Sequence, residues 1–531
     1  MRFLHLSASR VALILMLAAS AVGVQGSAPG RADAFTIAQV DGGPHYYGQF
    51  SHSLPDNPHF FPIMAWLRPA EEQGDIAAYM DFGLTGLVGV ENPEGAQESR
   101  LRQAGLHTLV QADERTRFDD LGAETSGWVL GDEQDMQLGP TACPGAVNAV
   151  KAGLPHDDRL RFNGYGKGVL EWETDDEAKC WLQQQDVSAA DTYWFTDPGK
   201  GAERFGYLYG KNVSRLRYLR ALGGGSPEPI WMDVELGWPF TEAAAQGGRR
   251  ILPAEARSAV WHSIIAGARG IIYFDHNFGP ATPGSTIRRE GYADTRATMK
   301  SVNAQITALA PVLNSPTVVS GWSQGEGTDT MVKWAVGGKA KKKRCGSKHG
   351  QKQRRKCKKK AKGSAAASKK RKKSCGTTGK KNCGRATPKG ALYVFAGATR
   401  SPVEGRFSLP CVGKTRAAVL GENRKLPVRH GSFSDRFADA NAIHIYRVRP
   451  VRSCVPARRA AAVPVDLSTG APPGTAAQEF GASHRVPRLV IAAIAALALA
   501  VLALLGFRRL TGHSPRRSGR SRRHGHRFGM R

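Results

Sequence analysis

The stretch Gly127-Trp128-Val129-Leu130-Gly131-Asp132-Glu133 is a short apolar run that ends in two adjacent carboxylates. This pattern predicts a buried strand with both acids at its C-terminal end. Further along the chain, Pro229-Ile230-Trp231-Met232-Asp233-Val234-Glu235 repeats it. Because a buried strand holds its backbone rigidly and delivers the acids at a rim, we expect Glu133 and Glu235 to face each other across one cleft.

Six further apolar runs are predicted to be strands, and helical stretches separate them. They lie at 60–66, 86–90, 107–111, 160–164, 187–193 and 270–275. Short apolar strands alternating with helices favour a parallel sheet, and this number of units fits an α/β fold of the (β/α)8 TIM-barrel type over 44–312. A doubly wound open sheet is the competing fold, but it would normally carry a Gly-rich phosphate turn after its first strand, and none is present.

A second domain is predicted beyond the barrel. Short strand-like runs without helical period occur in 315–338 and 390–450, which is typical of a small antiparallel β-sandwich. The segment 339–389 falls between two of these strands. It holds 23 Lys and Arg residues and no acid, so we expect a disordered basic insertion.

The chain's net charge of +30 is confined to two segments. The positive charges of the insertion and of the nine Arg residues in 508–531 together slightly exceed this net charge, so the rest of the chain is close to neutral. Two interpretations of the insertion stay open: adhesion to an anionic wall polymer through Lys339–Lys389, or a solvated loop without a fixed partner. The insertion has no aromatic residues for base stacking, which argues against a nucleic-acid partner.

Both ends of the chain carry targeting signals. Residues 1–34 have the charged start and short apolar run of a signal peptide and leader. The uncharged apolar run 489–507 is long enough for a transmembrane helix, and the Arg-rich tail 508–531 places that end in the cytoplasm. A Pro/Ala-rich stalk over 455–487 would connect an extracellular body to this single membrane anchor.

The eight cysteines, in an exported protein, make disulfides an expectation without fixing their pairing. No C-x-x-C pair occurs, so zinc is not indicated. The sequence points to no metal and no cofactor.

The barrel order, with Trp128–Glu133 on strand four and Trp231–Glu235 on strand seven, resembles retaining glycoside hydrolases of the large (β/α)8 clan that contains β-galactosidases and cellulases. The trailing stretch from Val419 to Arg447 is similar to the accessory β-domain that often follows such barrels. The resemblance implies an oligo- or polysaccharide substrate, with Glu133 as acid/base and Glu235 as nucleophile. In one respect the chain departs from the clan: Asp132 stands where an Asn that contacts the sugar usually precedes the acid/base.

The chemistry of glycoside cleavage agrees with two carboxylates. One protonates the leaving oxygen and the other meets the oxocarbenium-like centre, and a separation of about 5–5.5 Å gives retention. Other side chains at strand ends are candidates for substrate binding: Asp132, Trp66, Asn163, Tyr193, Trp194, Trp238 and His276. The alternative function is a non-catalytic surface carbohydrate-binding or wall-binding protein on a degenerate barrel. The identity of the sugar, the linkage and the oligomeric state cannot be read from the sequence.

Overall fold

The computed structural model describes residues 35–66, 73–90, 95–112, 125–197, 204–225, 227–240, 244–245, 247–277, 284–288, 290–336, 390–449, 454, 456–460 and 463–464. The predicted signal peptide, basic insertion, membrane span and cytoplasmic tail lie outside these ranges. Among the helices within them, none has the length and hydropathy that a bilayer span requires.

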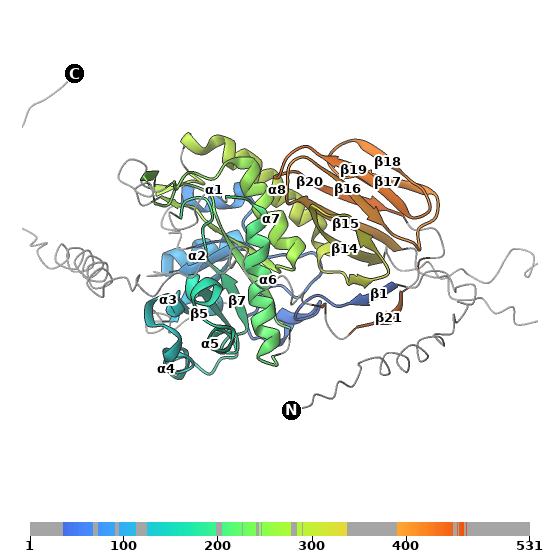
Figure 1. Ribbon diagram of the computed structural model, residues 1–531. Coiled ribbons are helices and arrows are strands. Elements are labelled where there is room, and N and C mark those ends of the chain that lie inside the picture. The colour runs from blue at the N-terminus through green and yellow to red at the C-terminus, as the bar shows by residue number, and fades with distance from the viewer. Residues whose placement is uncertain are drawn as a thin grey trace, which may run out of the picture. The chain divides into compact units, whose positions relative to one another are not determined.

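Eight parallel strands close into a barrel in chain order (Figure 1). They are β2 (Ile63–Trp66), β3 (Gly86–Val90), β4 (His107–Gln111), β5 (Thr125–Asp132), β6 (Leu160–Tyr165), β7 (Val187–Ala190), β8 (Ile230–Glu235) and β9 (Gly270–Phe274). β9 pairs with β2, with Tyr273 opposite Ala65, so no edge is left open. The predicted barrel is confirmed, because a doubly wound open sheet has no such closing pair.

Helices cover the outside of the barrel. They are α1 (Gln73–Phe82), α2 (Gly95–Ala104), α3 (Gln134–Leu138), α4 (Gly145–Ala152), α5 (Asp175–Trp181), α6 (Tyr207–Leu222), α7 (Pro253–Ala266) and α8 (Ala293–Leu313). Local sequence explains several boundaries. Thr174 and Glu177 form a capping box that begins α5. α7 begins with Pro253 and stops at Gly267, whose φ of 113° suits a glycine C-cap.

The strand alternation separates the barrel interior from the layer beneath the helices. On β8, Trp231 belongs to the interior cluster, whereas Met232 and Val234 pack in the layer between strands and helices. Because side chains alternate along a strand, Asp233 and Glu235 lie on the same side of β8 as Trp231. This alternation directs both acids toward the mouth of the barrel.

Two further sheets form the predicted β-domain. The larger has the order β18 (Arg424–Val428), β17 (Thr415–Val419), β20 (Ile443–Val448), β15 (Gly390–Ala398), β14 (Thr328–Val336), β12 (Thr317–Ser320), β1 (Phe35–Ala38) and β21 (Pro456–Arg459). The smaller consists of β13 (Ser323–Gln324), β16 (Val403–Ser408) and β19 (Ser432–Phe437). A short β10 (His276–Asn277) and β11 (Gly284–Ser285) pair beside the barrel.

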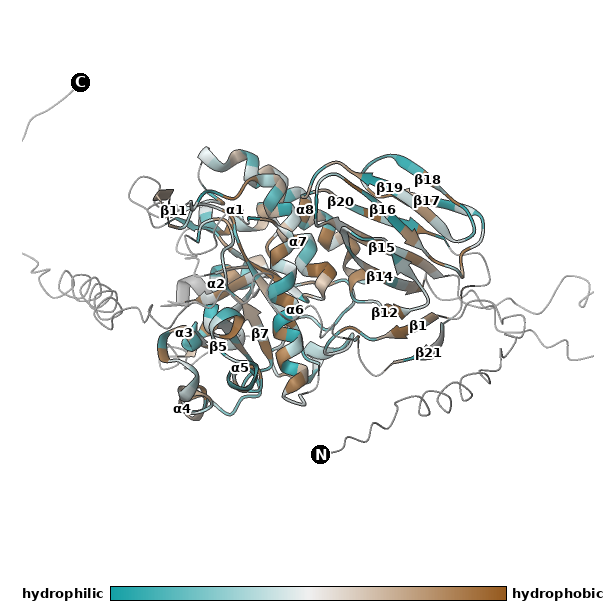
Figure 2. Cartoon of the chain, in the orientation of Figure 1, coloured by the Kyte–Doolittle hydropathy of each residue, from teal (hydrophilic) through white to brown (hydrophobic). Residues whose placement is uncertain are grey.

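The larger sheet packs on both of its faces. Val394 and Ala396 of β15 join the core of the sandwich, whereas Phe395 between them stacks on Trp261 of α7 at 5.9 Å. Hydrophobic residues accordingly gather between α7 and this sheet, while the outer strands β18 and β19 are largely hydrophilic (Figure 2). The core beneath the barrel helices therefore extends onto one face of this sheet, whereas the other face packs into the separate core of the sandwich.

Two strands of this sheet come from segments that were predicted to lie outside the domains. Phe35–Ala38 directly follows the predicted leader and pairs with β12, and Pro456–Arg459 at the start of the predicted stalk pairs with β1. The basic insertion leaves and rejoins the sheet at one place, because Val336 of β14 pairs with Gly390 of β15. Its removal would therefore leave the ends of these two strands opposite each other.

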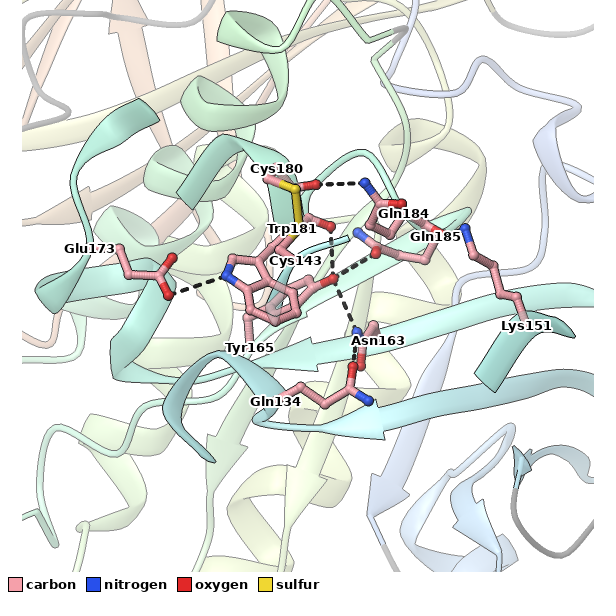
Figure 3. Close-up of a disulfide and its surroundings, with 10 residues drawn as sticks. All are labelled: Gln134, Cys143, Lys151, Asn163, Tyr165, Glu173, Cys180, Trp181, Gln184 and Gln185. Carbon is pink, nitrogen blue, oxygen red and sulfur yellow. Dashed lines mark hydrogen bonds between the residues drawn. A yellow bond between two sulfur atoms is a disulfide. The ribbon is translucent and has the colours of Figure 1, made fainter. Parts of the chain in front are cut away.

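Two disulfides occur in the described residues. Cys411 bonds to Cys454, and Cys143 bonds to Cys180 of α5. Figure 3 shows the second beside a buried hydrogen-bond network, in which the Asn163 side-chain amide donates to the Tyr165 hydroxyl. The structure thus gives the disulfide pairing of these four cysteines, which the sequence left open.

Candidate active site

Four acidic side chains gather at the C-terminal end of the barrel. Asp132 ends β5, Glu133 follows it, Asp191 follows β7, and Asp233 lies on β8. The four are close enough for their charges to act on one another's pKa. This is the end at which barrels of this kind carry their active sites.

Glu133 is held in an unusual backbone conformation. Its φ of 47° lies in the left-handed region, at the start of α3. Strain of this kind in a non-glycine residue clusters at functional sites. The side chains of Glu133 and Met136 both pack over Gly166, where an added Cβ would clash with Met136 Sδ and come within 2.7 Å of Glu133 Oε1, so a larger residue at position 166 would force both side chains to move.

Glu133 and Asp191 both have strongly raised pKa values. Burial, with the charges of Asp191 and Asp132, raises the pKa of Glu133 to about 9. The Lys167 ammonium counteracts part of this rise. Burial and the charge of Asp132 raise the pKa of Asp191 to about 8. Both groups therefore favour the protonated form at neutral pH.

The two remaining acids of the cluster differ in burial. Asp132 is half-buried, and burial with the charge of Asp135 raises its pKa to only about 6. Asp233 is buried, and burial with the charges of Asp191 and Asp132 raises its pKa well above the usual range. Asp132 is thus the acid of the cluster that ionises most readily.

Glu235 lies at the end of β8 and is fully enclosed. Its side chain has 0% exposure, and three donors surround the carboxylate. Oε1 accepts from the Tyr209 hydroxyl at 2.6 Å and from the Phe195 N–H at 2.8 Å, and Oε2 accepts from the Thr196 N–H at 3.0 Å. Burial raises its pKa to about 7, and these donors limit the rise because they favour the ionised form.

The loop after β7 is fixed from two sides. Glu235 binds its N–H groups, and the buried Arg204 guanidinium donates to the carbonyls of Trp194, Phe195 and Asp197. The loop carries Tyr193, whose ring packs on Phe274 at 4.8 Å. Burial and the charges of Asp191 and Asp233 raise the pKa of Tyr193, which places this predicted residue within the cluster.

Two predicted substrate residues are buried away from any opening. Trp66 is 4% exposed and belongs to the barrel interior, with its ring 6.4 Å from Phe162. Asn163 is fully buried between β6 and the helices, where it bonds to Tyr165 and Gln134 (Figure 3). A sugar could reach either side chain only if the residues packed over it moved, so their role in substrate binding stays a prediction.

The other predicted substrate residues lie closer to the mouth. Trp194 and Trp238 are half-buried, and the backbone N–H of Trp238 donates to Asn277 Oδ1 at 2.6 Å. His276 is half-buried, and its Nε2 lies 3.0 Å from the Trp66 carbonyl oxygen. These three side chains remain available to line a substrate site.

Sequence reasoning did not assign Asp191 or Tyr209 to the site. Asp191 could have been found, because Asp191-Thr192-Tyr193 follows an apolar strand just as Asp132-Glu133 does. Tyr209 carried no such signal, since it lies on α6 and reaches Glu235 only through the fold. Within the described part of the chain, no group of three or more His, Cys, Asp or Glu side chains could hold a metal ion.

No protein-family model and no curated protein sequence matches this chain. Similar solved structures include one titled "Glycoside hydrolase", with a TM-score of 0.40 and 10% identity, covering 78% of this chain and 97% of that one. Another is the family 51 α-L-arabinofuranosidase AbfB from Bifidobacterium longum (TM-score 0.38, 11% identity, 79% and 98%). A third is a glucosidase from Croceicoccus marinus (TM-score 0.33, 10% identity, 79% and 99%). Likenesses this distant carry no weight for activity, so the fold rests on the chain's own closed barrel and the function on its acids.

Proposed function

We propose that this protein is a glycoside hydrolase whose active site is the group of acids at the C-terminal end of the barrel. The observation that carries the proposal is the position of Asp132, Glu133, Asp191, Asp233 and Glu235, which all lie at the C-terminal ends of strands of one closed barrel. Their pKa values also differ, at about 9 for Glu133 against about 7 for Glu235 and about 6 for Asp132. Acids whose environments push their pKa values apart can take opposite roles at one pH.

In the proposed mechanism Glu133 donates its proton to the leaving glycosidic oxygen. As that C–O bond breaks, a carboxylate oxygen of Glu235 bonds to the anomeric carbon. Glu133, now ionised, then takes a proton from water, and the resulting attack releases the sugar with retained configuration and restores both acids.

Of the two Glu235 oxygens, Oε2 suits the attack better. It accepts from the Thr196 N–H alone, whereas Oε1 accepts from both Phe195 and Tyr209. Because Glu235 has no exposed surface, substrate entry must open the cover above it.

The test is hydrolysis of an aryl-glycoside panel by the full-length chain and by Glu133→Gln, Glu235→Gln and Asp191→Asn. The control is Glu404→Gln, which changes an exposed carboxyl on β16. We expect Glu133→Gln and Glu235→Gln to lower the rate of hydrolysis. NMR identifies the anomer that forms first, and an anomer of the same configuration as the substrate indicates retention. An unchanged rate in Glu235→Gln would exclude Glu235 as the nucleophile. An unchanged rate in Glu133→Gln on the panel members with poor leaving groups would overturn the proposed mechanism.

A second function is a carbohydrate-binding protein on a degenerate barrel. The enclosure of Glu235 favours it, as does the anionic Asp132 where the resembling clan has an amide. Oligosaccharide binding by the wild-type chain, with no turnover on the full panel, would select this function.

The setting that we propose is an exported body on a single membrane anchor. The disulfides Cys143–Cys180 and Cys411–Cys454 support an oxidising compartment. The insertion at 339–389 would then contact an anionic wall polymer outside the membrane. Protease added to intact cells tests this topology. We expect the protease to cleave the exported body, and full protection of the body would exclude the topology.

A further inference from the structure

A cavity of about 50 Å³ lies at the opposite end of the barrel from the acids. Arg269, directly before β9, and Phe61, before β2, mark this end. The other wall includes Lys333 of β14, so the cavity separates the barrel from the large sheet. Its volume is several times the roughly 10–15 Å³ that one water-sized sphere needs.

Cations outnumber acids around this cavity. Asp41 accepts from Arg217 Nε at 2.6 Å and from Arg217 Nη2 at 3.3 Å, so this pair neutralises itself. Arg269 and Lys333 line the same cavity and have no salt bridge among the described residues. The charge of Asp41 also acts on Arg269 and Lys333, but this single carboxylate faces three cationic side chains.

Both of these cations have donors to spare. Arg269 is 7% exposed, and its buried Nε and Nη1 have no hydrogen-bond partner in the described part of the chain. Lys333 is 3% exposed and donates to the Ser315 carbonyl at 3.1 Å and Thr317 Oγ1 at 3.0 Å, which leaves one of its three N–H groups. Buried donors in native proteins are almost always satisfied.

We propose that this cavity binds a small inorganic anion of the size of chloride or bromide, held by Arg269 and Lys333. An anion would offset the charge of both groups and accept from their unused donors. A water molecule would also accept from these donors, but it would leave the positive charge unbalanced. Burial lowers the pKa of Lys333 and of Arg269, and the charge of Arg269 lowers that of Lys333 further, so an anion between the two groups would oppose both shifts and favour their charged forms. The bound ion would join β14 to the base of the barrel.

The test uses the full-length chain at fixed pH and ionic strength, with sodium bromide exchanged stepwise for sodium gluconate. An ion that binds only the folded state raises Tm with its concentration, whereas gluconate is too large for the cavity. We expect Tm to rise with bromide in the wild type and this response to fall by at least half in Arg269→Met and Lys333→Met. The matched control is Arg400→Met, an exposed arginine 4.0 Å from Glu326, which should respond as the wild type does.

Crystals grown in bromide provide an independent measurement if either variant fails to fold. An anomalous peak between Arg269 and Lys333 in the wild type supports the proposal. Equal Tm values in bromide and gluconate with no such peak would mean a water-filled cavity and would overturn it. An equal bromide response in wild type, Arg269→Met and Lys333→Met would also overturn it, because the effect would then be a general salt effect.

Discussion

The Tyr209 hydroxyl donates to Glu235 Oε1 at 2.6 Å and thereby joins helix α6 to the end of strand β8. The Tyr209 hydroxyl in turn accepts from the backbone N–H of Trp194 at 3.3 Å, so the contact also fixes the loop after β7. A tyrosine in this position has two separable effects. It supports the loop, and it favours the ionised form of the acid that we propose as nucleophile.

Replacement of Tyr209 by Phe should shift the acidic limb of the rate profile. Loss of the donor raises the pKa of Glu235 above about 7, so kcat should reach half its maximum at a higher pH than in the wild type. The loss of a buried hydrogen bond should also cost about 1–3 kcal/mol of stability. The control is Tyr446→Phe, a fully buried tyrosine of the β-sandwich whose hydroxyl donates to Asp435. A Tm decrease without a pH shift in Tyr209→Phe would leave it only a structural role.

Replacement of Glu133 by Gln should slow hydrolysis by about 10²–10⁴-fold, the usual contribution of a general acid. The loss should be largest for alkyl glycosides and small for dinitrophenyl glycosides, because a good leaving group needs no proton. Steady-state kinetics on both substrate types measures the difference. Equal losses on the two substrates would contradict the role of proton donor.

The alkaline limb of kcat/KM should lie near pH 9 and respond to Asp191. The pKa of Glu133 is raised to about 9, with the charge of Asp191 as the largest contribution after burial. Asp191→Asn removes that charge, so the limb should move to lower pH. A limb that stays in place in an active Asp191→Asn variant would contradict this coupling.

The stability of the folded chain should fall as pH rises from about 4 to 9. Glu133, Asp191 and Asp132 have folded-state pKa values of about 9, 8 and 6, against ordinary values near 4. Between these limits the folded state holds protons that the unfolded state has released, so the free energy of unfolding decreases with pH. Thermal unfolding across this range measures the slope. The double variant Glu133→Gln/Asp191→Asn should flatten it, whereas Asp176→Asn, with a side chain 90% exposed, should not.

Deletion of 339–389, with a short Asn-Gly turn in its place, should leave the fold and the hydrolytic rate unchanged. The register supports this expectation, because Val336 and Gly390 are paired where the insertion begins and ends. Binding to an anionic wall polymer should weaken and lose its steep salt dependence. If the deletion variant binds the wall polymer as tightly as the wild type, with the same salt dependence, the insertion is only a spacer.

Local sequence patterns are sufficient to predict the barrel and the strands that carry its acids. Apolar runs ending in polar residues, such as Trp128–Glu133 and Trp231–Glu235, are local patterns, and the period of two fixes which side chains share a face. Local reasoning placed Trp66 and Asn163 on barrel strands, but it could not give their burial, which depends on what the neighbouring strands and helices place against them.

Only the tertiary structure decided the environment of the acids. The pKa values of Glu133 and Asp191 depend on burial and on charges from different strands, which no local pattern encodes. The three donors to Glu235 come from a loop and a helix, and the unpaired Arg269 and Lys333 meet only because the sheet packs under the barrel. Strand patterns are properties of neighbouring residues, whereas pKa values and cavities are properties of what the fold brings together.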